Sequence, residues 1–347
     1  MRRSDVRTCY LALACLLFTI EARAQALISP ASDPETTSAT SNVPARASGT
    51  AASTPVFKAG VDLVGLSVVV TDKQSKFVTG LKANDFAVYE DGIQQDVSFF
   101  AAEQVPLDLA LLLDTSASML DKMQTMQQAA IGFASTLRPG DHITVLEIKD
   151  TVKVVHPLDG DIEAANQAIR HTTARGGTSL YNGLYLGLKE MAKNRRATGE
   201  VRRQAIAVLS DGDDTTSLVT YDDVMELAKK SGIAIYTITL KSEFAVRQAS
   251  LAGRRYFSQS EFSMKALAQE TGARSFFPIR IEELSGVYSL IADELANQYA
   301  IGYTSKNPRR DGAFRRVIVR VMERPEMRTR TRSGYVSARA ERVASVQ

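Results

Sequence analysis

The chain has 347 residues, of which 44% are hydrophobic and 23% are charged, the composition of an ordinary soluble protein. This length allows one large domain and one smaller domain, each with its own buried core. The formal net charge is only +3, and residues 25–347 hold 38 Lys and Arg against 37 Asp and Glu. This even balance excludes a general electrostatic attraction to membrane surfaces or to nucleic acid, so we expect no nucleic-acid partner.

The first 24 residues have the pattern of a secretory signal peptide. Three arginines give a positive start, an almost purely apolar stretch covers 9–20, and Ala22-Arg23-Ala24 supplies the small residues that signal peptidase requires. The apolar stretch is too short to span a membrane comfortably. We therefore expect cleavage before Gln25, a secreted or periplasmic protein, and no transmembrane segment in the mature chain.

Both cysteines, Cys9 and Cys15, lie inside this predicted signal. A lipid anchor on Cys15 is disfavoured, because Ala12 stands where a lipobox prefers leucine and the apolar stretch continues past the cysteine. The mature chain therefore has no cysteine, and its stability does not rest on disulfides.

A linker and a β segment follow. Residues 25–56 are rich in Ser, Thr, Ala and Pro and poor in large apolar side chains, which predicts a disordered linker. Residues 57–104 are predicted to form β structure. A strand-like run covers 61–70, and Glu90-Asp91-Gly92 is a hairpin turn that leads into a strand over 94–100.

From residue 105 to residue 297, apolar strand-like runs alternate with amphipathic helical stretches. The first expected helix has apolar residues at steps of four and three, namely Met119, Met123, Met126, Ala130, Phe133 and Leu137. Expected strands are 107–113, 143–148, 152–155, 205–209, 233–240 and 274–278, and further helices cover 161–171, 221–230, 262–270 and 284–295, with another beginning near 180. The alternation predicts an α/β fold, in which a doubly wound, mostly parallel sheet is flanked by helices.

The C-terminal part returns to β structure. Strands are expected at 298–304, 315–322 and 328–336, followed by a flexible tail at 338–347. Neither this segment, 298–337, nor 57–104 has enough strands for a stable core, so we expect the two flanks to form one small all-β unit. Arginines alternate with threonines over 328–332, which we interpret as a solvated strand face rather than an anion-binding stripe.

Three oxygen-bearing clusters interrupt the α/β region. The apolar run 109–113 stops at Asp114-Thr115-Ser116-Ala117-Ser118, a Gly-Gly-Thr turn covers 176–178, and the run 205–209 stops at Ser210-Asp211-Gly212. Ligands bind at the carboxyl ends of parallel strands, and two of the clusters stand at such ends. The candidate metal ligands are Asp114, Ser116, Ser118, Thr178 and Asp211.

These residue types favour one hard divalent cation. An all-oxygen octahedral shell suits Mg²⁺ best, with Mn²⁺ or Ca²⁺ as alternatives. A set so poor in carboxylates leaves the cation under-neutralised, so we expect it to take an outside Glu or Asp as its last ligand. The competing interpretation is that Ser116 and Ser118 only cap a helix. Asp213 and Asp214, beside Asp211, are expected to be solvated loop carboxylates.

These motifs resemble the von Willebrand factor A domain, in which D-x-S-x-S, a threonine and an aspartate build a metal-ion-dependent adhesion site. The resemblance covers about 105–297, and all five candidate ligands match the pattern. It implies a protein-binding function, with the threonine coordinating mainly when the partner is bound. The flanks, including Glu90-Asp91-Gly92 and Arg332-Ser333-Gly334-Tyr335, are similar to secreted VWFA-related proteins of acidobacteria.

We therefore predict a secreted or periplasmic binding protein that captures an acidic side chain of a protein partner through its metal. One alternative is a cell-envelope scaffold or assembly factor with an incidental metal site, and a weaker one is a metal-dependent hydrolase. Catalysis is disfavoured, because Ser116 stands where an aspartyl-nucleophile phosphatase needs a second carboxylate. The sequence also has no Gly-x-Ser-x-Gly elbow, Walker A loop or His-Glu-x-x-His motif, so we expect no enzyme.

Overall fold

The computed structural model describes residues 63–102, 105–198, 202–211, 213–252 and 258–339. The predicted signal peptide, the linker 25–56 and nearly all of the predicted tail lie outside these ranges. In the part of the chain that is described, no helix is both long enough and apolar enough to cross a membrane.

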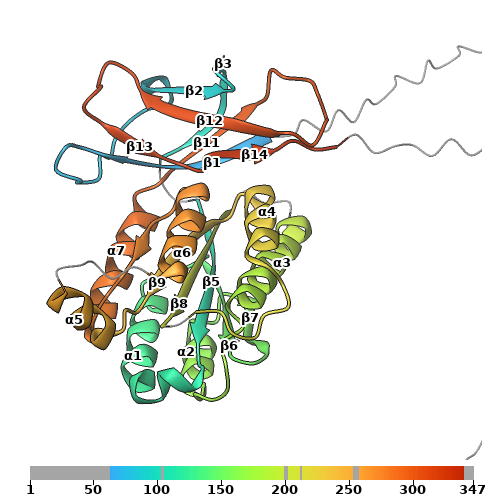
Figure 1. The fold of residues 1–347 in the computed structure, drawn as a ribbon. Coiled ribbons are helices and arrows are strands. Elements are labelled where there is room, and N and C mark those ends of the chain that lie inside the picture. Colours follow the sequence, from blue (N-terminus) through green and yellow to red (C-terminus); the bar gives the residue numbers. More distant parts are fainter. Residues whose placement is uncertain (1–62, 103–104, 199–201, 212, 253–257, 340–347) are drawn as a thin grey trace, which may run out of the picture. The chain divides into compact units, whose positions relative to one another are not determined.

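A six-stranded sheet forms the centre of the α/β region (Figure 1). Its strand order is β10-β9-β8-β5-β6-β7, and every neighbouring pair is parallel except β6 and β7. The strands are β5 (Leu107–Asp114), β6 (His142–Ile148), β7 (Val152–Asp159), β8 (Arg203–Ser210), β9 (Ala234–Thr239) and β10 (Ser275–Phe276). All eight residues of β5 are buried, because this strand lies inside the sheet and helices cover both its faces.

Helices cover the two faces of this sheet (Figure 1). On one face, Leu111 packs in a cluster with Phe133 and Ile291, and on the other face Leu112 packs with Leu184. The helices are α1 (Met123–Ala134), α2 (Ile162–Arg170), α3 (Leu180–Thr198), α4 (Tyr221–Ser231), α5 (Glu243–Leu251), α6 (Gln259–Glu270) and α7 (Leu284–Ala296), with 3₁₀ turns η1 (Ala83–Asp85), η2 (Ala117–Lys122) and η3 (Ile281–Glu283). The predicted α/β fold is confirmed.

The flanks form two four-stranded antiparallel sheets, with orders β13-β1-β11-β4 and β14-β12-β2-β3. Their strands are β1 (Leu63–Thr71), β2 (Phe86–Glu90), β3 (Ile93–Gln95), β4 (Val97–Ala101), β11 (Tyr299–Thr304), β12 (Phe314–Val321), β13 (Arg328–Arg330) and β14 (Gly334–Val336). Strands from before and after the α/β region pair directly, β1 with β11 and β2 with β12, and share one buried cluster. The predicted all-β unit is therefore confirmed.

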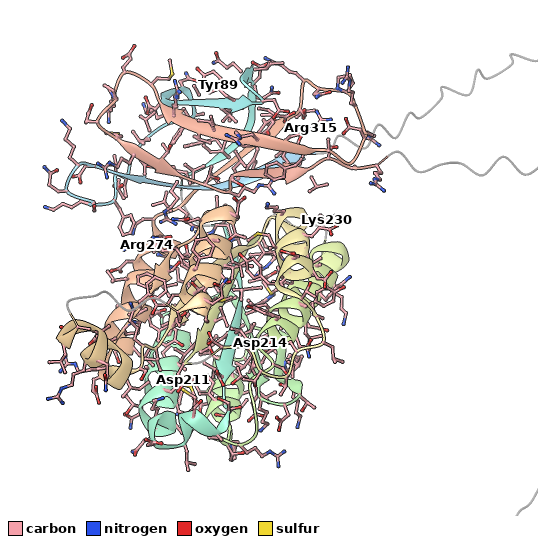
Figure 2. All side chains as sticks on the ribbon, viewed as in Figure 1. Tyr89, Asp211, Asp214, Lys230, Arg274 and Arg315 are labelled. Carbon is pink, nitrogen blue, oxygen red and sulfur yellow. The ribbon has the colours of Figure 1, made fainter. Side chains whose placement is uncertain are left out.

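A buried ion pair joins the two flanks at the centre of this β unit. Glu90 and Arg315 each have about 2% of their side chain exposed, and Arg315 Nη1 lies 3.3 Å from Glu90 Oε1. The hydroxyls of Tyr303 and Tyr335 both donate to Glu90 Oε2 at 2.9 Å, and Ser305 donates to Oε1 at 2.6 Å. Because every donor comes from the C-terminal flank, this one carboxylate fixes how the flanks meet (Arg315 is labelled in Figure 2).

Two predicted strands were each divided in the structure. The stretch 94–100 contains parts of β3 and β4, which belong to different sheets, and 328–336 contains β13 and β14. The hydrophobic pattern did not reveal these breaks because a strand that changes sheets keeps its alternation of inward and outward side chains. Helix α5 was also not predicted.

Of the three arginines in 328–332, Arg328 is exposed as we expected, but Arg330 and Arg332 are partly buried and paired. Arg330 Nη2 lies 2.5 Å from Oε2 of Glu294, a side chain in α7 that is only 1% exposed. Arg332 donates to the Gly65 carbonyl at 2.9 Å and lies over the Tyr335 ring. A buried carboxylate without a counter-charge is costly, so Arg330 pairs with Glu294 instead of facing solvent.

Candidate metal centre

Two neighbouring parallel strands bring the first and last candidate ligands together. Asp114 is the last residue of β5, and Asp211 directly follows Ser210, the last residue of β8. The two strands pair in register up to Leu113 and Leu209, so both aspartates reach the same edge of the sheet. Figure 2 shows Asp211 at the end of the sheet away from Arg274 and Lys230. The structure therefore brings these two clusters together at one edge of the sheet, as predicted.

The Asp114 carboxylate is fully buried, with 0% of the residue exposed. Its Oδ1 accepts a 2.9 Å hydrogen bond from the Ser116 backbone N–H, and its Oδ2 accepts a 2.6 Å bond from the Ser210 hydroxyl. Burial raises the pKa of Asp114 above its ordinary value, the bonds from Ser210 and Ser116 oppose this rise, and the charge of Asp211 adds to it. The carboxylate is thus held in place but its charge is poorly compensated.

The two serines of the D-x-S-x-S motif point their hydroxyls at each other. Ser116 Oγ lies 3.0 Å from Ser118 Oγ, and Ser118 Oγ donates a 2.7 Å bond to Asp211 Oδ1. Ser116 occupies the N-cap position of η2, yet its side chain makes no capping hydrogen bond. The helix-capping interpretation of Ser116 is therefore wrong, and its hydroxyl belongs to the polar cluster instead.

Lys122 completes this cluster, although we did not predict it. Its ammonium pairs with Asp211 Oδ2 and also donates to the Ser118 carbonyl at 3.1 Å. The Asp211 side chain is 5% exposed and the Lys122 side chain 34%. The 3₁₀ turn η2 ends at Lys122, four residues after Ser118, and the lysine stem is long enough to reach the Ser118 carbonyl. That spacing was visible in the sequence.

The Gly-Gly-Thr turn lies against the D-x-S-x-S segment. The Ala117 N–H donates to the Gly176 carbonyl at 3.0 Å, and the Arg175 N–H donates to the Thr115 carbonyl at 2.9 Å. Thr178 is 5% exposed, and its N–H donates to the Thr215 hydroxyl at 2.9 Å. Within the described residues, the structure links Asp114, Ser116, Ser118 and Asp211 through direct hydrogen bonds, whereas Thr178 is brought beside them only through its loop.

Asp214 is not the solvated carboxylate that we expected. Its Oδ1 accepts from the Tyr181 N–H at 3.2 Å and from the Ser217 hydroxyl at 2.6 Å, near the start of α3 (Figure 2). Asp213 is exposed, as expected. Asp214 therefore holds the loop after Asp211 against the loop that carries Thr178. The role of Ser210 was also not predicted. The sequence placed this serine at a strand end but did not show that it binds Asp114.

This donor set fits a hard divalent cation. It offers two carboxylates and three hydroxyls, all oxygen, which is the preference of Mg²⁺, Mn²⁺ and Ca²⁺. In the described part of the chain, Asp114 has no basic partner, although an unpaired buried carboxylate normally acquires one. No group of three or more His, Cys, Asp and Glu side chains suited to a metal occurs among these residues. A metal at this edge would therefore depend on hydroxyl ligands.

The sequence profile described as von Willebrand factor type A domain matches residues 108–277. Residues 108–277 form a von Willebrand factor type A (VWA) domain. The D-x-S-x-S segment, the Gly-Gly-Thr turn and Asp211 all fall within the matched range.

Relatives of this chain come from several organisms. The "Uncharacterized protein sll0103" of Synechocystis sp. is 33% identical over 114 residues, which is 32% of this chain and 26% of that protein. A "UPF0353 protein" of Mycolicibacterium paratuberculosis is 24% identical over 54% of this chain and 60% of its own length. Inter-alpha-trypsin inhibitor heavy chain H1 of Sus scrofa is 23% identical over 37% of this chain and 15% of its own. The chain thus spans less than two thirds of each of these relatives.

Solved structures with a similar fold share little sequence. Proximal thread matrix protein 1 from the mussel byssus, in a structure with a zinc-occupied MIDAS motif, has 17% identity and a TM-score of 0.45, over 60% of this chain and 50% of its own. The SpRpn10 VWA domain has 14% identity and a TM-score of 0.41, over 54% of this chain and 95% of its own.

Proposed function

We propose that this protein is a secreted or periplasmic binding protein whose VWA domain holds one divalent cation and with it captures a carboxylate of a protein partner. Asp114, Ser116, Ser118, Thr178 and Asp211 would hold the cation, which we expect to be Mg²⁺. A bound cation supplies an open position for a hard anionic oxygen. We expect no catalytic turnover.

The observation that carries this proposal is the uncompensated charge of Asp114. Its carboxylate is fully buried, and both its oxygens accept hydrogen bonds from neutral groups of Ser116 and Ser210. The neighbouring hydroxyls of Ser116 and Ser118 are oriented toward one another rather than used to cap a helix. A cation bound here would offset the desolvation of this carboxylate.

Charge balance supports an acidic partner. Asp114 and Asp211 carry two negative charges, and Lys122 contributes one positive charge at Asp211. A divalent cation added to these three groups leaves a net charge of about +1 at the site, by formal charges alone. A Glu or Asp of a partner neutralises that excess, whereas a basic or neutral side chain does not.

The first test measures the cation itself. Calorimetric titration of the mature protein with Mg²⁺ and Mn²⁺ should give one site per chain, and Asp114→Asn should abolish it. Ser289→Ala, which removes an exposed hydroxyl on α7, is the matched control and should bind as the wild type does. Absence of binding to the wild type by either ion would overturn the proposal.

The second test concerns the partner. Crosslinked capture from the cell envelope should recover a protein with wild type and not with Asp114→Asn, and EDTA should prevent it. Replacing the acidic residues of that protein one at a time should then identify the one that binds. Thr178→Ala should weaken the partner more than the metal, as the family resemblance implies. Enzymatic turnover on a panel of ester and phosphate substrates would favour the hydrolase alternative.

Export belongs to the same proposal. N-terminal sequencing of the exported protein should find Gln25 as the first residue, and an intact Met1 on membrane-embedded material would contradict it.

A second candidate function is a cell-envelope scaffold that works without the metal. The contact between Lys122 and Asp211 favours it, because the lysine already neutralises one of the two carboxylates. Equal partner capture with and without EDTA would select this candidate.

A further inference from the structure

The ammonium of Lys122 lies against the carboxylate of Asp211, one of the five candidate metal ligands. It contacts Asp211 Oδ2 and donates to the Ser118 carbonyl at 3.1 Å, while Asp211 Oδ1 accepts from Ser118 Oγ at 2.7 Å. Both oxygens of Asp211 are therefore engaged. A cation that coordinates Asp211 and Ser118 has to displace these contacts or share the carboxylate with a lysine.

Sharing is unfavourable on electrostatic grounds. Lys122 and a divalent cation would both lie against one carboxylate that is only 5% exposed, where solvent screens their repulsion poorly. The Lys122 side chain can move more easily than that of Asp211, because 34% of it is exposed and it has a flexible four-carbon stem. The lysine is thus the group that moves.

We propose that Lys122 is an internal competitor for the divalent cation, which neutralises Asp211 in the metal-free domain and is released when the metal binds. This inference rests on the proposed function, since it takes the five candidate ligands as a metal site. It assigns Lys122 two roles, which are to stabilise the metal-free site and to set how tightly the metal is held.

The structure has room for the released ammonium. A cavity of about 550 Å³ borders Asp211 and Lys122, and its wall includes Asp121 and Glu282. These two carboxylates line the same cavity as Lys122, and either one offers the released ammonium a new counter-charge. Released into this cavity, the ammonium remains beside the metal and adds a second positive group for an acidic partner.

Lys241 provides a matched control because it lines the same cavity but pairs elsewhere. Its ammonium lies 3.0 Å from Glu261 Oε2, and Glu261 is buried. Lys241 therefore shares the surroundings and the charge of Lys122, without the contact to Asp211.

The first experiment compares metal affinity by calorimetric titration of wild type, Lys122→Met and Lys241→Met with Mg²⁺ and Mn²⁺. Methionine keeps the length of the side chain and removes its charge. We expect Lys122→Met to bind about fivefold more tightly or better, since a partly exposed ion pair of about 1 kcal/mol corresponds to that factor. Lys241→Met should leave the affinity unchanged. Lys122→Gln provides a second variant if the methionine does not fold.

The second experiment reads the lysine directly. Acetylation with a water-soluble reagent, quantified by peptide mass spectrometry, should modify Lys122 severalfold faster in saturating Mg²⁺ than in EDTA. Lys241 should react at the same rate in both. In Asp114→Asn, metal should not change the rate at Lys122, because this variant is expected to lose the ion.

The outcomes separate this inference from the proposed function. Metal binding by neither wild type nor Lys122→Met would overturn the metal site itself. Metal binding of equal affinity by both, with an unchanged Lys122 reaction rate, would overturn the competition while the metal site stands. Binding by Lys122→Met alone would support the competition, but it would overturn the proposed function, because the wild-type chain would then hold no metal.

Discussion

The hydroxyl of Ser210 donates a 2.6 Å hydrogen bond to Asp114 Oδ2, which joins the last residues of strands β8 and β5. Both residues are buried, with 4% and 0% exposed. Ser210 therefore orients the Asp114 carboxylate without standing among the candidate ligands, in the way that residues behind a metal's own ligands commonly act.

Ser210→Ala should weaken metal binding about tenfold, because groups that orient a ligand typically contribute at least that factor. It should also lower the free energy of unfolding by about 1 kcal/mol, the usual value of one lost hydrogen bond. Titration calorimetry and urea unfolding measure the two effects. An unchanged metal affinity would show that Asp114 is positioned by the Ser116 N–H alone.

Asp114→Asn should have opposite effects on stability and binding. An acid whose pKa is raised on folding destabilises the native state at every pH above its unfolded pKa, so removal of its charge should stabilise the metal-free protein at pH 7. The same change removes a ligand, so Mg²⁺ should no longer raise the melting temperature. Thermal unfolding in EDTA and in Mg²⁺ tests both effects. A variant that is less stable than wild type in EDTA would indicate that the hydrogen bonds to Asp114 outweigh its buried charge.

Ser116→Ala distinguishes a ligand from a helix cap. The Ser116 hydroxyl makes no capping bond but lies 3.0 Å from Ser118 Oγ, so its loss should cost about 1 kcal/mol of stability, as loss of a true N-cap also does. Metal affinity should fall. Thr220→Ala is the matched control, since Thr220 does cap α4 by accepting from the Asp223 N–H. A metal affinity that is unchanged in Ser116→Ala, as we expect for Thr220→Ala, would restore the capping interpretation.

The α/β fold and the position of the site could be predicted from the sequence, because both depend on local patterns. The continuous apolar runs of β5 and β8 require burial on both faces, and each run ends at the polar residue that begins a site loop. The hairpin at Glu90-Asp91-Gly92 was predictable for the same reason, and Asp91 and Gly92 both have positive φ there, as such turns require.

The contacts that depend on tertiary packing were not predictable. Lys122 meets Asp211 across 89 residues, and Arg330 meets Glu294 only because β13 packs near α7. A lysine or arginine in a polar segment looks solvated until the fold places a buried carboxylate beside it. Ser210 similarly has an ordinary strand-end sequence, and its role depends on the register between β5 and β8.

Glu90→Gln should destabilise the β unit by about 3 kcal/mol, because it leaves the buried guanidinium of Arg315 with only the more exposed carboxylate of Asp311, 3.6 Å away, as counter-charge. Limited proteolysis should then cut within β1 or β12 while the VWA domain stays resistant. Glu226→Gln, which breaks an exposed pair with Lys230 on α4, is the control and should cost about 0.5 kcal/mol at most. Equal effects of the two substitutions would mean that the buried network does not join the flanks.

Gly176→Ala tests whether the Gly-Gly-Thr turn positions Thr178. Gly176 has φ +70°, which costs a non-glycine residue about 1 kcal/mol, and a Cβ there would lie 1.9 Å from Asp150 Oδ2. Asp150 would have to move, although its Oδ1 accepts a 2.6 Å bond from the Gly177 N–H that holds the turn. We therefore expect a loss of about 2 kcal/mol in stability, from the strain together with the lost bond, and weaker metal binding.

Two further variants complete this test. Gly132→Ala lies in α1, where a Cβ meets nothing within 4 Å, and should raise stability by about 0.5 kcal/mol because alanine favours the helix. Asp150→Ala should cost much less in the Gly176→Ala background than in wild type, since the bond to Gly177 is already lost there. Urea unfolding of wild type, Gly176→Ala, Asp150→Ala and the double variant measures this coupling. Additive losses would show that the left-handed backbone alone, without Asp150, makes glycine necessary at position 176.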